Sequence, residues 1–208
     1  MTKTITRVYG DYATAARAVS EMKEAGLSDS NISIVASNAD GWHKPGGNNV
    51  DPKHDKDRDG KDDRAEGAAT GGGLGAMAGG AAGLATGLGL LAIPGIGPVV
   101  AAGWLAVTAA GAVAGGATGG IIGALVESGT SKENAELYAE ALRRGGAVVT
   151  AKVPDDEEGR YMAILDRSAV DVTRRVDAYR SSGWKGYDPA APAYNVEQVR
   201  REREAYRL

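Results

Sequence analysis

Residues 67–126 read GAATGGGLGA MAGGAAGLAT GLGLLAIPGI GPVVAAGWLA VTAAGAVAGG ATGGIIGALV, sixty consecutive residues without Asp, Glu, Lys, Arg or His. Nineteen of these residues are Gly. Such a run would normally indicate a loop, since glycine costs about 1 kcal/mol per residue in an exposed helix. A loop of this length without polar side chains, however, could not satisfy its own backbone. The run therefore favours regular structure.

The spacing of the glycines predicts helices. Every fourth residue lies near one helical face, and a ridge of glycines lets a second helix approach to backbone contact. Two series have this spacing, separated by a turn sequence at Pro94, Gly95, Gly97 and Pro98. We expect a hairpin of two glycine-zipper helices, whose packing residues are Gly71, Gly75, Gly79, Gly83 and Gly87 in the first arm and Gly111, Gly115, Gly119 and Gly123 in the second.

Two environments could hold this hairpin. In a bilayer, internally hydrogen-bonded helices are the simplest way to span the hydrocarbon. The arms, 68–93 and 97–126, would be about 39 and 45 Å long, against a hydrocarbon core of ~30 Å. The dry centre of a homo-oligomer is the alternative, because glycine faces let subunits interlock. The sequence leaves both open.

The flanking segments predict an α+β domain. Residues 4–9, 31–36 and 147–153 have the composition of strands, and Val170, Val172 and Val176 outline a further one. Helices are expected after Asp11, at the capping box Thr130-Ser131-Lys132-Glu133, and after Pro154. Together these elements predict a ferredoxin-like, four-stranded antiparallel sheet, split by the inserted hairpin. Each half is too small to bury a core alone, so we expect the halves to pack together.

The acidic linker before the hairpin contains a calcium-loop pattern, D-x-D-x-D-G-x5-E. Its oxygen ligands would be Asp55, Asp57, Asp59, Asp63 and Glu66. An apolar residue is missing at the eighth position, where Asp62 stands, and Pro45 and Pro52 argue against a preceding helix. A Ca²⁺ site and a solvated charged linker both remain open.

Composition restricts the function classes. A net charge of −3 gives no electrostatic footprint for nucleic acid, and the absence of Cys excludes thiolate catalysis. Gly73-Leu74-Gly75 follows a charged linker instead of a strand, which argues against a dinucleotide site. No catalytic residues and no small-molecule substrate are identified.

Several segments resemble the bacterial heat-induced general stress proteins. They are the Arg7-Val8-Tyr9 strand, the Asp-rich linker, the Leu90–Pro98 turn, Arg143-Arg144-Gly145-Gly146 before a Val-rich strand, and Ser182-Gly183-Trp184. The resemblance extends to about residue 194. It implies a role in the stress response, and it carries no catalytic residues with it.

From these observations we expect a non-enzymatic stress-response protein. Its hairpin would insert in the cytoplasmic membrane and self-associate, with both termini in the cytoplasm. The alternative is a homo-oligomeric assembly or binding module outside the membrane, with Ca²⁺ as a regulator in either case. The expected segments are 1–36 and 127–180 for the two halves of the domain, 37–66 for the linker, 67–126 for the hairpin, and 181–208 for a tail with a charged helix.

Overall fold

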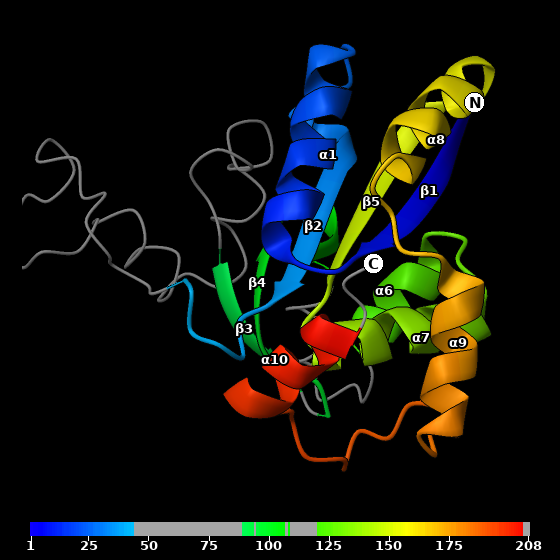
Figure 1. Ribbon diagram of the computed structural model, residues 1–208. Coiled ribbons are helices and arrows are strands. Elements are labelled where there is room, and N and C mark those ends of the chain that lie inside the picture. The colour runs from blue at the N-terminus through cyan, green and yellow to red at the C-terminus, as the bar shows by residue number, and fades with distance from the viewer. Residues whose placement is uncertain (44–88, 94, 107, 109–119, 206–208) are drawn as a thin grey trace, which may run out of the picture.

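A computed structural model describes residues 1–43, 89–93, 95–106, 108 and 120–205. These residues form an α+β structure around one antiparallel five-stranded sheet, whose strand order is β1-β5-β2-β4-β3 (Figure 1). The strands are β1 (Thr2–Tyr9), β2 (Ile32–Ser37), β3 (Gly89–Ile93), β4 (Gly97–Ala102) and β5 (Ala147–Pro154). The α-helices are α1 (Tyr12–Glu24), α6 (Gly120–Glu127), α7 (Lys132–Arg143), α8 (Glu158–Asp166), α9 (Val172–Ser181) and α10 (Val196–Ala205). Short 3₁₀ turns occupy Asp29–Asn31 and Asp155–Glu157.

Local sequence explains where the first helices begin and end. The Asp11 carboxylate accepts a hydrogen bond from the Thr14 N–H at 2.8 Å, which caps α1. Gly26, with φ of 100°, follows the helix in the left-handed conformation that glycine tolerates best. Ser131 caps α7 in the same way through the Asn134 N–H. The predicted start of α1 is confirmed, and α7 begins within the predicted capping box, with Ser131 instead of Thr130 as its N-cap.

Strand β5 joins the two halves of the domain. It lies between β1 and β2 and is antiparallel to both, so that Val149 stands opposite Arg7 on one side and Ile34 on the other. This strand is buried along most of its length, which explains its nearly continuous apolar sequence. The expectation that the two halves share one sheet agrees with this pairing.

Helices cover both faces of the sheet, making three layers. On one face, α1 and α8 pack over alternate strand residues such as Ile5, Ile34 and Val149. On the other face, α6 and α7 pack over the intervening residues, among them Val35 and Val148. The alternation follows from the two-residue period of a strand. α9 and α10 lie at the end of the molecule near α7 (Figure 1).

The centre of the uncharged run forms a β-hairpin, so the prediction that helices extend through residues 89–93 and 97–102 is wrong. The turn itself is where it was expected: the Ile96 N–H donates to the Ile93 carbonyl at 3.1 Å. Gly95 and Gly97 have φ of 72° and 103°, a conformation that favours glycine. Periodicity alone cannot separate a short buried strand from a helix. The four-residue glycine spacing stops at Gly87 and resumes at Gly111, which leaves this centre outside both series.

The sheet has five strands where four were predicted, and the strand expected at Val170, Val172 and Val176 is wrong. In this segment the Val170 N–H donates to the Val8 carbonyl of β1 (2.8 Å). Asp171 then accepts from the Arg174 N–H and begins α9. Val172, Val176 and Tyr179 recur at helical spacing, and the acid before them is an N-cap signal.

Several sequence predictions fall outside the described residues. These are the whole calcium-loop pattern, the first glycine series, Gly111, Gly115, Gly119 and Pro94. Within the described ranges, no helix combines the length and the apolar character needed to cross a bilayer. The same ranges contain no group of three or more His, Asp or Glu side chains close enough to hold a metal ion.

Candidate functional site

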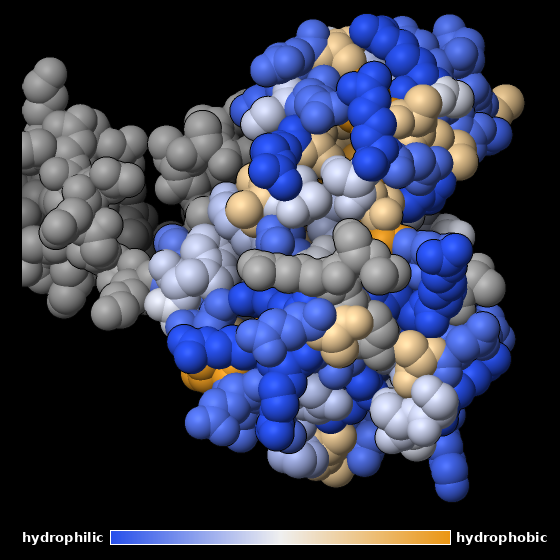
Figure 2. Space-filling model, viewed as in Figure 1, coloured by the Kyte–Doolittle hydropathy of each residue, from blue (hydrophilic) through white to orange (hydrophobic). Residues whose placement is uncertain are grey.

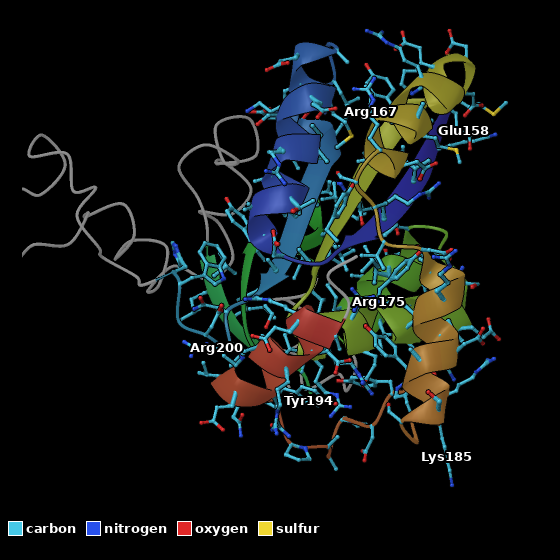
Figure 3. All side chains as sticks on the ribbon, in the orientation of Figure 1. Glu158, Arg167, Arg175, Lys185, Tyr194 and Arg200 are labelled. Atoms are coloured by element: carbon cyan, nitrogen blue, oxygen red, sulfur yellow. The ribbon has the colours of Figure 1, made fainter. Side chains whose placement is uncertain are left out.

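The Arg143–Gly146 step lies where α7 ends and β5 begins, beside α9 and α10. We use the name arginine cluster for Glu140, Arg143, Arg144, Tyr179 and Glu202. Its centre is Arg144, which is buried although it carries a charge. Figure 3 shows Arg175 of α9 and Tyr194, before α10, on different sides of this region. Buried charges need paired and hydrogen-bonded partners, so the contacts of Arg144 decide what the cluster does.

All three guanidinium nitrogens of Arg144 have a protein acceptor. Nε donates to Glu140 at 2.6 Å, Nη1 to Glu202 at 2.8 Å and Nη2 to the Ser182 hydroxyl at 3.0 Å. The guanidinium also lies 4.2 Å from the centre of the Tyr179 ring, a cation–π distance. Arg144 thus connects α7, α9 and α10 through one side chain.

The cluster shifts the pKa values of Arg144 and Tyr179, among others. Burial disfavours the charge of Arg144, but the hydrogen bonds to Glu202 and Glu140 outweigh it and raise the pKa of Arg144. Burial also raises the pKa of Tyr179 to about 12, against the lowering effect of Arg175 and Arg144. Arg144 therefore stays charged and Tyr179 stays neutral at ordinary pH.

Helix α10 packs closely over Gly145. Gly145 has φ of 97°, and a Cβ there would stand 2.3 Å from a methyl carbon of Val199. Arg203 donates to the Gly145 carbonyl at 2.8 Å and to Asp40 at 2.6 Å. This one helix is thus anchored to the α7–β5 junction and to the loop after β2.

A cavity of about 90 Å³ remains beside the cluster, lined by Tyr9, Asp11, Arg144, Arg175, Tyr179 and Glu202. Two of its acidic groups already have partners in the fold: Asp11 caps α1, and Glu202 pairs with Arg144. The geometry of the cluster is that of a structural clamp between helices. It accounts for the Arg-Arg-Gly-Gly step as a folding feature.

The outer face of α6 has a different character. Its inner side chains, Ile121, Ala124 and Leu125, are buried against the domain. Gly123 is exposed, and no described atom lies within 4 Å of the position that a Cβ would take there. Val126, one turn further on, is 42% exposed. We call Gly123 and Val126 the glycine face; both are exposed on the side of α6 that does not pack on the domain, and the exposed Glu127 follows them.

Of the predicted packing residues, Gly123 is therefore the one that the structure places. The turn residues Gly95 and Gly97 lie against the tail instead: a Cβ on Gly95 would meet backbone atoms of Asp188 and Pro189, and one on Gly97 would meet Ala193. Pro98 is exposed on β4. The turn is thus covered by the segment before α10.

Sequence reasoning missed Glu140, Tyr179 and Glu202. A signal existed for Glu140, because it stands three and four residues before Arg143 and Arg144, the spacing of helical ion pairs. Tyr179 and Glu202 come from α9 and α10, and their approach to Arg144 depends on tertiary packing that no local pattern encodes.

Searches of protein-family models, curated proteins and solved structures find no match to this chain. The resemblance to heat-induced general stress proteins thus stays a prediction from the sequence.

Proposed function

We propose that this chain is a non-enzymatic, self-associating protein, whose uncharged glycine-rich segment packs against the same segment of other copies. The observation that carries the proposal is the open glycine face of α6. Gly123 ends the second glycine series, and it faces outward without a described neighbour in its own chain. A helix from another copy can approach that face to backbone contact.

Gly123 weakens α6 and packs against no described residue of its own chain. Glycine in an exposed helix is about 1 kcal/mol less favourable than alanine. Nothing in the described part of the domain needs the missing side chain, because the space around it is open. Val126 adds an apolar side chain to the same face. Close helix packing between copies supplies a reason for both residues.

Replacing Gly123 by Leu tests the proposal. We expect Gly123→Leu to keep or raise the melting temperature, since leucine favours a helix and has room, and at the same time to lose the assembled species. Sedimentation velocity of the full chain measures the second effect. Unchanged sedimentation of Gly123→Leu would refute the proposal.

The matched control is Gly159→Leu on α8, where the glycine is also exposed and no described atom lies within 4 Å of its Cβ position. This variant adds the same side chain to a helix on another part of the surface. It should leave the assembled mass unchanged. Loss of assembly in both variants would point to a general effect of surface leucine.

Lipid is a second candidate partner for the uncharged run. The observation in its favour is the length before β3: residues 67–88, 22 in number, would extend about 33 Å if helical, against a ~30 Å hydrocarbon core. Residues 103–119, between β4 and α6, number only 17. Flotation with liposomes distinguishes the two partners, because an assembly of copies alone stays with the protein fraction.

We further propose that the domain is a split ferredoxin-like unit with an altered edge. The order β1-β5-β2, with α1 and α8 on one face, supports this. The fourth strand of a ferredoxin-like sheet would lie beside β1, where this chain has the hydrogen bond from the Val170 N–H to the Val8 carbonyl. The stress-response role, membrane insertion with cytoplasmic termini, and Ca²⁺ regulation remain predictions from the sequence.

A further inference from the structure

The two edges of the sheet differ in how well they are protected against pairing with another strand. β1 and β3 are the edge strands. An edge strand turns a row of backbone N–H and C=O groups outward, and proteins usually protect it with charges or a covering segment. Which edge is protected therefore indicates which one is available for pairing.

The β1 edge is protected. Lys3 pairs with Glu158 at 2.6 Å, and Arg7 pairs with Asp166, so two cations of β1 are held against α8. The Val170 N–H occupies the Val8 carbonyl. Another strand approaching β1 would meet these charges and the chain that follows α8.

The β3 edge has no such protection in the described part of the chain. β3 is Gly89-Leu90-Leu91-Ala92-Ile93, without a charged residue or a proline, and its described strand partner is β4. Leu90 is 44% exposed, and Gly89 and Ala92 are exposed as well. By contrast, hydrophilic side chains cover most of the face over α1, α8 and α10 (Figure 2). β3 has the features of a strand that pairs with another strand.

We propose that β3 pairs in antiparallel fashion with β3 of a second copy, which would continue the sheet across a twofold axis. Charge favours a second copy as the occupant. An uncharged strand can lie against itself without like-charge repulsion, and it offers no countercharge to an acidic or basic peptide. Antiparallel pairing of identical strands also satisfies the twofold symmetry of a closed dimer.

This inference rests on the proposed self-association and adds a second surface to it. Five paired residues bury less than the ~1,000 Å² that a stable interface requires. Pairing at β3 would thus act together with contacts at the glycine face. The two surfaces belong to separate elements, so variants can test them one at a time.

The absence of Cys from the sequence allows a direct test with single-cysteine variants of the full chain. Antiparallel pairing on a twofold axis places one residue of β3 opposite itself, with Cβ atoms roughly 5 Å apart. Among Leu90→Cys, Leu91→Cys and Ala92→Cys, at least one should give a covalent dimer with a short bismaleimide. Thr2→Cys, exposed on the β1 edge, is the matched control and should stay monomeric on a denaturing gel.

A charged substitution gives the second readout. Leu90→Lys adds an edge charge at an exposed position, so we expect it to fold and to lose the larger species in sedimentation; Thr2→Lys should retain it. If neither the cysteine variants nor Leu90→Lys differ from their controls while Gly123→Leu still loses assembly, the β3 inference is overturned and the proposed function stands. A wild-type chain that stays monomeric overturns both.

Discussion

At the residue scale, Tyr179 reports on the arginine cluster. Its ring carries Arg144 on one face, and burial raises its pKa to about 12 from the ordinary 10. The fold therefore favours the neutral phenol. This contribution to the free energy of unfolding is complete below pH 10, and it is lost as the pH rises from about 10 to about 12. The same burial that stabilises the cluster should thus be visible as a late tyrosine titration.

The prediction compares Tyr179→Phe with the wild type in a pH-jump titration followed at 295 nm. Phenylalanine keeps an aromatic ring next to Arg144 and removes one titrating phenol. We expect the variant to lose absorbance change near pH 12 while the change near pH 10 stays the same. Loss of amplitude near pH 10 would mean that Tyr179 is exposed and that α9 and α10 do not close over the cluster.

At the element scale, the packing of α10 on the α7–β5 junction depends on Gly145. Gly145 combines a left-handed φ with a Cβ position that Val199 occupies. Gly145→Ala therefore destabilises through strain and through collision with α10. Val199→Ala alone should cost about 2 kcal/mol, because it removes buried methyl groups.

A double-mutant cycle separates the two effects. We expect Gly145→Ala to cost clearly less in the Val199→Ala background, because the colliding methyl groups are gone, while the cost of the φ strain remains. Urea unfolding of the four proteins measures this coupling. Additive costs would contradict the packing of α10 on the α7–β5 junction.

The helices and strands also show which parts of the fold local sequence signals predict. Helix-capping residues and the alternation of apolar and polar residues predicted β1, α1, β2, α7 and β5, because these signals lie within a few residues of one another. Local signals could not predict the hairpin of β3 and β4, because its uncharged residues fit a helix or a buried strand equally well. At Val170–Val176, strand-forming valines outweighed the helix-starting Asp171 in the prediction, and the structure reverses this.

At the scale of the whole molecule, the described parts of the uncharged run have two roles. Its centre completes the sheet as β3 and β4, and its end forms α6, which covers the sheet with one side and presents Gly123 on the other. The sequence predicted the turn, and most of the glycine ridge that it also predicts lies outside the described residues. It could not show which residues the domain would use for its own core, because that depends on long-range pairing of β4 with β2.

The sedimentation of the full wild-type chain, over a range of concentrations and without detergent, tests self-association most directly. If copies associate, a species heavier than the 21.3 kDa chain forms reversibly as the concentration rises. A single species at 21.3 kDa throughout would contradict it.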